Sequence, residues 1–252
     1  MRVGRSSPDS VEDFAPAPWH SAGNGRPTVM TMQSITRQRI GNEAEPLIVI
    51  DGFASDPDAL RGAAAQVPFG PAGAHYPGMC AQIPESYLQD QLPVVARGLG
   101  REFGSCRRIR VVDAQFSIVT ISPGALEIRQ RVPHVDAYGR DRIALIHYLS
   151  PTHRDGTAFF RHRATGFETI DETRAPEFFA RLGSEVEAMP PEGYIAEDSA
   201  LFERTALVEA DYNRALLYRS YVLHSGAIAR DAILSADPAL GRLTVTAFLA
   251  IE

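Results

Sequence analysis

The chain of 252 residues contains no lysine, so all 25 of its basic residues are arginine. Without lysine the protein has no Schiff-base former, no amine nucleophile and no ammonium group to anchor a carboxylate. The sequence also lacks a Gly-x-Ser-x-Gly elbow, which argues against a Ser/His/Asp hydrolase.

Cysteines and long apolar runs are also scarce. Cys80 and Cys106 are the only cysteines and form no Cys-x-x-Cys motif, so we predict no disulfide framework and a reducing compartment. No apolar run approaches the roughly 18 residues of a membrane span, and we expect a soluble, cytoplasmic protein. The net charge of −6 argues against nucleic acid as a partner.

The first part of the chain differs in composition from the rest. Residues 1–42 are rich in Pro, Gly, Ser and Asn with little hydrophobic periodicity, which predicts a flexible N-terminal extension. The remaining residues, 43–252, are expected to form a single domain with N-terminal helical support, because a chain of this length commonly builds one β-rich core.

The periodicity of the remaining chain predicts a mainly β fold with flanking helices (α+β). Helices are expected at 55–66, 87–104 and 175–188, and a long loop at 68–84. Strands are expected at 46–51, 109–112, 115–121, 143–149, 158–161, 215–219 and 243–251. Several short strands separated by turn residues favour an antiparallel sandwich or barrel over a βαβ fold.

The first candidate metal ligands are His134 and Asp136, in the segment Pro133-His134-Val135-Asp136. On an extended segment a spacing of two places both side chains on the same face, where they can bind one ion. Pro133 cannot donate to a β-ladder and suits the edge of a sheet. Taken alone, the pair is more often a surface His and Asp beside a turn.

His224 is the candidate third ligand. It ends the apolar run Tyr221-Val222-Leu223 and precedes Ser225-Gly226, where the chain is expected to turn. Taken alone, it would be a hydrogen-bonded core histidine. Together with His134 and Asp136 it completes two imidazoles and one carboxylate, the facial triad of non-haem iron enzymes.

Arg242 opens a strand-like run in which alternation separates two faces. One face carries Arg242, Thr244, Thr246 and Phe248, and the other carries Leu243, Val245, Ala247 and Leu249. A buried arginine is costly unless it is paired with an anion. An internal salt bridge is one possibility. The upstream ligands favour a bound carboxylate, held in a guanidinium fork with a hydrogen bond from Thr244.

The order His-x-Asp, His, Arg-x-Thr resembles that of the Fe(II)- and 2-oxoglutarate-dependent oxygenases. The sequence is most similar to a bacterial branch near the prolyl-hydroxylase-like oxygenases, in which a stretch like Ile50-Asp51-Gly52-Phe53 precedes the core. A strand like Ala144-Leu145-Ile146-His147-Tyr148-Leu149 follows the His-x-Asp motif. Prolyl hydroxylases usually anchor the keto-acid with lysine, and here Arg242 would replace it.

This resemblance implies a double-stranded β-helix (jelly-roll) core over about residues 46–252. It implies Fe(II) bound by His134, Asp136 and His224, and O2 as the oxidant. The co-substrate 2-oxoglutarate would be bound by Arg242 and Thr244, with Tyr148 as a further contact. Related halogenases replace the carboxylate ligand with a small residue, so Asp136 favours hydroxylation or another oxidation over halogenation.

The expected partner is a small-molecule or peptide substrate, without nucleic acid or membrane; the oligomeric state stays open. Two other classes also stay open. A cupin-type dioxygenase or isomerase would use a metal without 2-oxoglutarate, although the strand region lacks the usual His-x-His pair. A non-catalytic jelly-roll binding module would show no metal-dependent turnover.

Overall fold

A computed structural model describes residues 32–73, 76–104, 106–152, 155–229, 232 and 234–252. From residue 31 onwards the chain forms one compact unit. Within the described ranges, no helix has the length and apolar character needed to cross a membrane.

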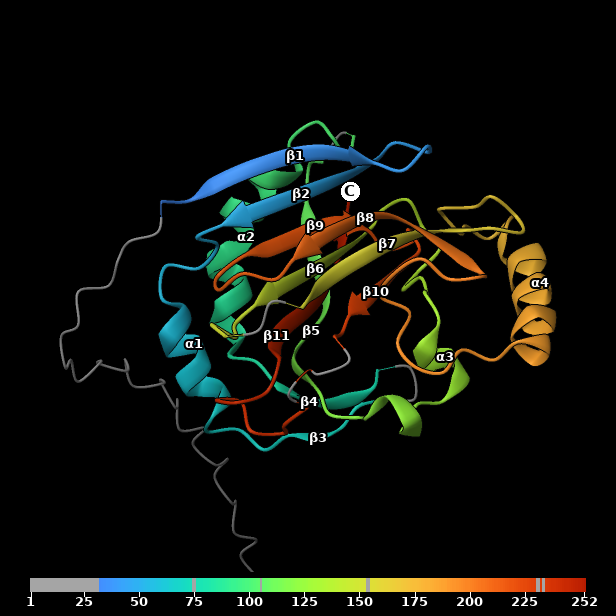
Figure 1. Ribbon diagram of the computed structural model, residues 1–252. Coiled ribbons are helices and arrows are strands. Elements are labelled where there is room, and N and C mark those ends of the chain that lie inside the picture. Colours follow the sequence, from blue (N-terminus) through green and yellow to red (C-terminus); the bar gives the residue numbers. More distant parts are fainter. Residues whose placement is uncertain (1–31, 74–75, 105, 153–154, 230–231, 233) are drawn as a thin grey trace, which may run out of the picture. The chain divides into compact units, whose positions relative to one another are not determined.

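Two antiparallel sheets form the centre of this unit (Figure 1). The larger sheet has the strand order β1-β2-β9-β6-β11-β5-β4-β3 in the described part of the chain. Its strands are β1 (Ser34–Ile40), β2 (Glu45–Asp51), β3 (Gly70–Pro71), β4 (Gly78–Gln82), β5 (Ile109–Val119), β6 (Arg142–Tyr148), β9 (Ala215–Arg219) and β11 (Leu243–Ile251). The smaller sheet has the order β10-β7-β8, made of β7 (Gly156–His162), β8 (Phe202–Glu209) and β10 (His224–Ala227).

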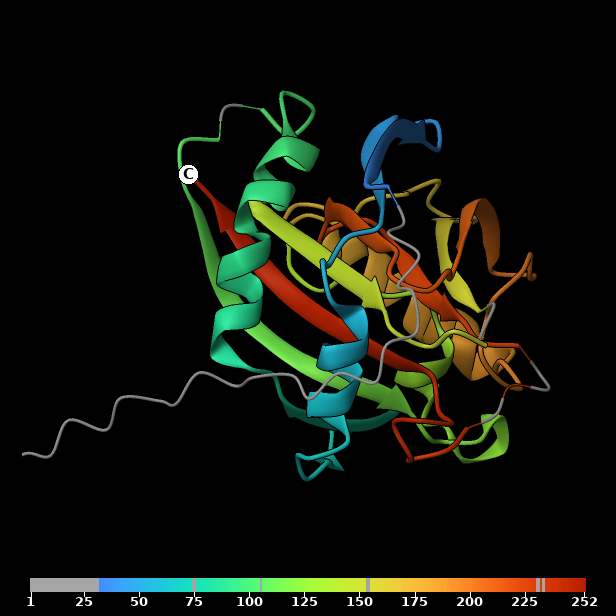
Figure 2. The same cartoon turned by 90° about the vertical axis from the view of Figure 1, so that its left-hand side faces the viewer.

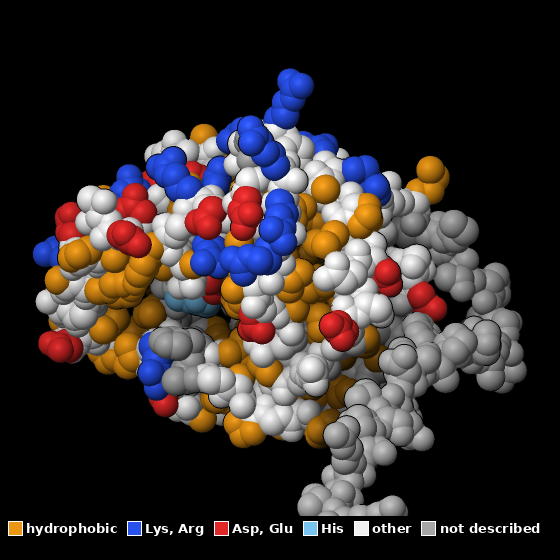
Figure 3. All heavy atoms as spheres, turned by 180° about the vertical axis from the view of Figure 1, so that it is seen from behind, with side chains coloured by type: hydrophobic (Ala, Val, Ile, Leu, Met, Phe, Trp, Pro, Cys, Tyr) orange, Lys and Arg blue, Asp and Glu red, His pale blue; other side chains and the backbone are white. Residues whose placement is uncertain are grey.

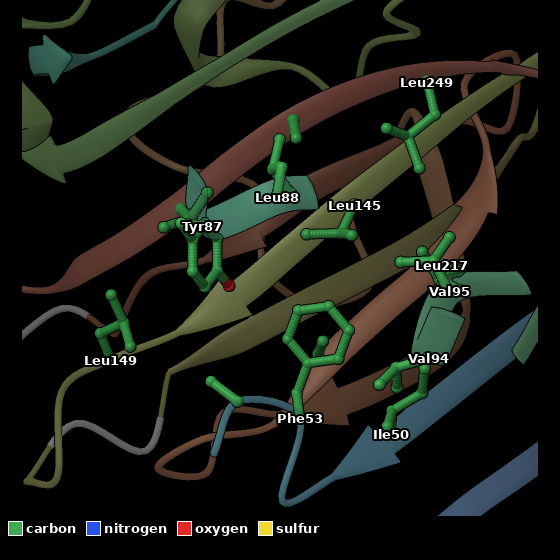
Figure 4. Packing of buried hydrophobic residues seen from close by; sticks show 14 of the residues in the cluster. Ile50, Phe53, Tyr87, Leu88, Val94, Val95, Leu145, Leu149, Leu217 and Leu249 are labelled. Atoms are coloured by element: carbon green, nitrogen blue, oxygen red, sulfur yellow. The ribbon is translucent and has the colours of Figure 1, made fainter. Parts of the chain in front are cut away.

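Helices α1 (Pro57–Ala64) and α2 (Glu85–Leu99) cover one face of the larger sheet (Figure 2). The buried residues of α2 recur every three to four positions, which gives the helix one apolar stripe. Gly98 lets this stripe approach the sheet closely, because a Cβ there would lie 3.0 Å from Ile50 Cδ1 and 3.1 Å from Leu217 Cδ1. Figure 4 shows Tyr87, Leu88 and Val95 of α2 over this layer.

The opposite face of the larger sheet packs against the smaller sheet. Tyr148 and Tyr218 of the larger sheet share one buried cluster with Phe159 and Val208 of the smaller sheet. Beyond the smaller sheet, α4 (Ala175–Ala188) buries Phe178 and Leu182 against Phe160 and Phe202. The short helix α3 (Ile128–Arg131) precedes the His-x-Asp segment.

The structure confirms the α+β class and most of the predicted elements. Helix α4 has the predicted bounds, and β2, β6, β7, β9 and β11 lie where strands were expected. The two strands expected at 109–112 and 115–121 are one continuous strand, β5.

Other elements correct the sequence-based prediction. Strand β4 lies inside the stretch expected to be a loop, and β8 and β10 were not predicted. The flexible extension was expected over residues 1–42. Its first 31 residues lie outside the described part of the chain. Its last part is not an extension, because Ser34–Ile40 forms β1 and pairs with β2. Most β1 side chains are exposed, so backbone pairing forms this strand without hydrophobic periodicity.

A buried hydrogen-bond network at His147 links α2 to the sheet and to the turn before α1. The Tyr87 hydroxyl and His147 Nδ1 lie 2.5 Å apart, and His147 Nε2 lies 3.0 Å from Asn213 Oδ1. Asn213 in turn bonds both backbone polar groups of Ala54. Burial lowers the pKa of His147 to about 4, so this imidazole is neutral at pH 7.

This neutral histidine predicts a pH-dependent stability. The folded pKa of His147 lies below the unfolded value, so its contribution is present above about pH 6.5 and is lost as the pH falls toward 4. The free energy of unfolding of the wild type should exceed that of His147→Gln at pH 7, and this difference should shrink by roughly 2–3 kcal/mol between pH 7 and pH 4.5. Urea unfolding of both proteins measures this gap, and other titrating groups cancel in the difference. A gap that stays constant over this range would contradict the prediction.

Candidate metal centre and its cavity

The three predicted ligands, His134, Asp136 and His224, lie together between the two sheets. Their potential ligand atoms all lie within 4.8 Å of one another. Asp136 Oδ1 is 3.7 Å from His134 Nε2, and Asp136 Oδ2 is 3.5 Å from His224 Nε2. The two imidazole rings have centroids 4.5 Å apart.

Backbone pairing brings these residues into position. His134 and His224 form an antiparallel bridge in which each backbone N–H donates to the other residue's carbonyl, at 2.9 and 3.0 Å. The Asp136 N–H donates to the Ser220 carbonyl at 2.8 Å, which fixes the backbone two residues beyond this isolated bridge. His134 and Asp136 point to the same side, as the sequence predicts, although the chain bends at Asp136.

The protonation states suit metal binding. His224 Nδ1 lies 2.9 Å from the Val222 carbonyl oxygen, a contact that places the ring proton on Nδ1 and leaves Nε2 free to donate its lone pair. Burial lowers the pKa of His224 to about 4. Burial raises the pKa of Asp136 to about 6, while His134 acts in the opposite direction. At pH 7 His224 therefore offers a neutral imidazole and Asp136 a carboxylate, the forms that bind metal ions.

The geometry of the three residues fits one transition-metal ion. Neighbouring ligands around an ion at ~2.1 Å lie about 3 Å apart in an octahedral arrangement. The two nitrogen–oxygen separations of 3.5 and 3.7 Å are slightly wider and would contract on binding. Only one side of such an ion would be occupied by protein, because the side chain of His134 stays 47% exposed toward the opening. Open positions would remain for other ligands.

These residues line a cavity of about 620 Å³ between the sheets. Its wall includes Arg242, which directly precedes β11, and one face of β11, with Thr244, Thr246 and Phe248. The alternate residues Leu243, Val245, Ala247 and Leu249 pack in the core under the helices, so both predicted faces of this strand are confirmed. Seen from behind, the molecule has a hollow in which a histidine side chain is visible, with arginine side chains along one rim (Figure 3).

Arg242 is a buried cation with unused hydrogen-bonding capacity. Its residue is only 6% exposed, and Nη2 donates to the Gly156 carbonyl at 3.0 Å. Nε has no hydrogen-bond partner, and no carboxylate in the described part of the chain forms a salt bridge with the guanidinium. The internal salt bridge considered as an alternative is thus not seen among these residues. A buried, unpaired guanidinium lining a cavity is suited to bind an anion.

A family model described as "Family of unknown function (DUF6445)" matches residues 31–249. The chain belongs to the DUF6445 family. No curated protein matches this sequence.

Several solved structures resemble this DUF6445 protein at low identity. The non-heme alpha ketoglutarate dependent epimerase SnoN from nogalamycin biosynthesis is 15% identical, with a TM-score of 0.47 over 83% of this chain and 80% of its own. HygX from Streptomyces hygroscopicus, with nickel and 2-oxoglutarate bound, is 11% identical, with a TM-score of 0.45 over 83% and 84%. An N-substituted L-amino acid dioxygenase from Burkholderia ambifaria AMMD, in complex with alpha-KG, is 14% identical, with a TM-score of 0.39 over 87% and 96%.

The other two predicted residues of the DUF6445 chain lie around Arg242. Thr244 is buried and lines the cavity, and its hydroxyl donates to the Ser117 carbonyl at 3.3 Å. The guanidinium carbon of Arg242 lies 5.6 Å from the centre of the Tyr148 ring. The Tyr148 hydroxyl forms a hydrogen bond with Thr157 Oγ1 at 2.7 Å. This bond fixes the Tyr148 ring against the guanidinium of Arg242.

Two further tyrosines near Arg242 were not predicted. Tyr76 and Tyr194 both line the cavity, and the charge of Arg242 acts on both phenols. Burial raises the pKa of both, to about 12 for Tyr194, so both hydroxyls are protonated donors at pH 7. The Tyr194 hydroxyl donates to the Ile121 carbonyl, whereas that of Tyr76 is buried without a hydrogen-bond partner. Both lie in irregular segments, where no periodicity could reveal them.

Tyr218 is a third cavity residue that was not predicted from the sequence, although the alternation of residues along its strand indicates its position. Its ring packs edge-on against His224, with centroids 4.9 Å apart, and it lines the cavity. Alternation along β9 puts Leu217 under the helices and Tyr218 on the opposite face. That alternation could have assigned Tyr218 to the cavity side once β9 was predicted.

The geometry predicts that metal affinity depends on these three side chains. Anaerobic titration with Co(II), whose visible spectrum reports its ligands, should show one ion per chain. Asp136→Ala and His224→Ala should each weaken binding by at least about 100-fold, because each removes a direct ligand. The matched control is Asp141→Asn, which changes a carboxylate five residues along that is not part of the triad. Unchanged affinity in both ligand variants would show that the ion binds elsewhere.

Proposed function

We propose that the protein is an Fe(II)- and 2-oxoglutarate-dependent oxygenase, most simply a hydroxylase of a small molecule or peptide. The observation that carries this proposal is the buried guanidinium of Arg242. It lines the same cavity as the three candidate metal ligands and has an unpartnered Nε among the described residues. An enzyme that used the metal alone would not need this second, cationic subsite.

His134, Asp136 and His224 would hold Fe(II), which together with 2-oxoglutarate supplies the power to oxidise an unactivated C–H bond with O2. The protein's own contribution is to fix these ligands. The Val222 carbonyl sets the orientation of the His224 ring, and the edge of Tyr218 packs against it. With Asp136 as a ligand, the site has a carboxylate where a halogenase would admit chloride.

The distal carboxylate of 2-oxoglutarate fits the surroundings of Arg242. Arg242 Nε and the Tyr76 hydroxyl are two buried donors without an acceptor. Leaving such groups unpaired costs about 1–3 kcal/mol each. A carboxylate accepts several hydrogen bonds and would satisfy both donors. The Thr244 hydroxyl donates to the Ser117 carbonyl at 3.3 Å and would have to turn from it to donate to the carboxylate. The Tyr148 ring lies against the guanidinium, 5.6 Å from ring centre to guanidinium carbon.

The same proposal extends to the fold and to the relatives of this chain. Two facing antiparallel sheets with the candidate site between them are consistent with a double-stranded β-helix core. We place the chain beside the prolyl-hydroxylase-like oxygenases, with arginine as the keto-acid anchor in place of lysine. Residues 32–252 would then be one oxygenase domain, with O2 as the remaining co-substrate.

The proposal predicts a visible absorption band when Fe(II) and 2-oxoglutarate are added together without oxygen. This metal-to-ligand charge-transfer band should appear in the wild type and be lost in His224→Ala. In Arg242→Gln, half-maximal absorbance should need about 10- to 100-fold more 2-oxoglutarate, because charge-assisted hydrogen bonds contribute roughly 1.5–3 kcal/mol. Arg110→Gln, a change to an exposed arginine on β5, serves as the control.

Other outcomes would separate the alternatives. Metal binding without a response to 2-oxoglutarate would favour a cupin-type enzyme and overturn the proposal. Absence of metal binding would favour a non-catalytic module. Once the band is established, succinate release on addition of O2 tests turnover.

A further inference from the structure

The cavity is longer than the proposed co-substrate needs. Along the cavity face of β11, Arg242 and Phe248 are six residues apart, which corresponds to about 20 Å on an extended strand. A five-carbon keto-acid anchored at Arg242 reaches only part of this length. The end of the cavity at Phe248 therefore stays available for the substrate; this inference rests on the proposed function.

Cross-strand register defines the residues at that end. Phe248 pairs with Asp113 of β5 on one side and with Ala144 of β6 on the other. Ala144 pairs in turn with Tyr218, which packs against His224. All four line the cavity. One row across the sheet thus leads from Asp113 to the candidate metal centre, over three strand spacings or about 14 Å.

Among the described residues, the charge at this end of the cavity is negative and unpaired. Of the described residues, only Asp113 and Asp136 bring carboxylates to the cavity lining, and Asp136 is the candidate ligand. Asp113 is exposed to the opening and has no ion pair or hydrogen bond with any described residue. Gln115, next along the same face, is also without a side-chain partner there and adds an amide.

The remaining cations of the cavity wall have other partners. Arg129 forms a salt bridge with Glu127. Arg131 donates from three nitrogens to the carbonyls of Leu126 and Pro191. Neither arginine forms a salt bridge with Asp113. An incoming cation would therefore meet a carboxylate that no described arginine neutralises.

We propose that Asp113, Gln115 and Phe248 form a subsite for a cationic group of the substrate, an amine or a guanidinium. Asp113 would accept charge-assisted hydrogen bonds from the cation, and Gln115 would offer its amide oxygen. Phe248 supplies an aromatic face for the cation or for the apolar part beside it. The oxidised carbon would lie toward Tyr218, several bonds from the charge.

Three probes of similar shape test the charge preference. These are 2-phenylethylamine, which is cationic at pH 7.5, its neutral analogue 2-phenylethanol, and anionic 3-phenylpropanoate. Calorimetry or ligand-observed NMR at low salt, on protein with and without 2-oxoglutarate, gives their dissociation constants. The amine should bind about fivefold more tightly than the alcohol, the anion most weakly, and 2-oxoglutarate should not displace the amine.

Variants assign this preference to Asp113. Asp113→Asn should remove the advantage of the amine and leave the alcohol unchanged. Asp90→Asn, on α2 at the other face of the sheet, should behave as the wild type. Equal affinity for the three probes, no binding of any probe, tighter binding of the anion, or an unchanged preference in Asp113→Asn would each overturn the inference.

The same variant separates this inference from the proposed function. With Fe(II) and 2-oxoglutarate, Asp113→Asn should give the visible band at wild-type co-substrate concentrations. A normal band without any amine preference would reject the cationic subsite and retain the oxygenase. An amine preference at Asp113 in a protein that never gives the band would reject the oxygenase and leave only a cation-binding cavity.

Discussion

The candidate site depends on one pair of backbone hydrogen bonds, those that His134 and His224 exchange with each other. These residues are 90 positions apart in the chain, and the bridge holds their rings at 4.5 Å. Asp136 lies two residues further along the chain, where its N–H donates to the Ser220 carbonyl. The backbone pairing therefore brings the ligands together before any ion binds, and only their side chains need to adjust to contract the site.

Strand β11 gives this centre its surroundings. It lies within the larger sheet and is paired on both sides, with β5 and β6. Its apolar face is sealed by α1 and α2, while its polar face lines the cavity. The helices therefore do not contribute to the chemistry directly. They allow the other side of this central segment to carry two buried polar residues, Arg242 and Thr244, beside the cavity.

Much of this arrangement could be predicted from the sequence, because it depends on local periodicity. Alternation from Arg242 to Leu249 gave the correct faces, and the spacing of His134 and Asp136 gave their common direction. Tyr76 could not be predicted, because it lies in a stretch rich in glycine and proline whose path is fixed by tertiary contacts. Strands β1 and β4 were missed for a related reason, since both lie near the edges of the larger sheet and need few buried side chains.

The fixed register of β11 also bears on regiochemistry. A strand that is paired on both sides cannot slide, so the distance from Asp113 to Tyr218 across the sheet is constant. Asp113 pairs with Phe248, and Tyr218 packs against His224. On the proposed binding mode, a substrate anchored by its cation presents to the metal whichever carbon lies at that distance. If the substrate were longer by one methylene, the oxidised carbon would keep its distance from the charged group. It would then lie one carbon further from the uncharged end of the substrate.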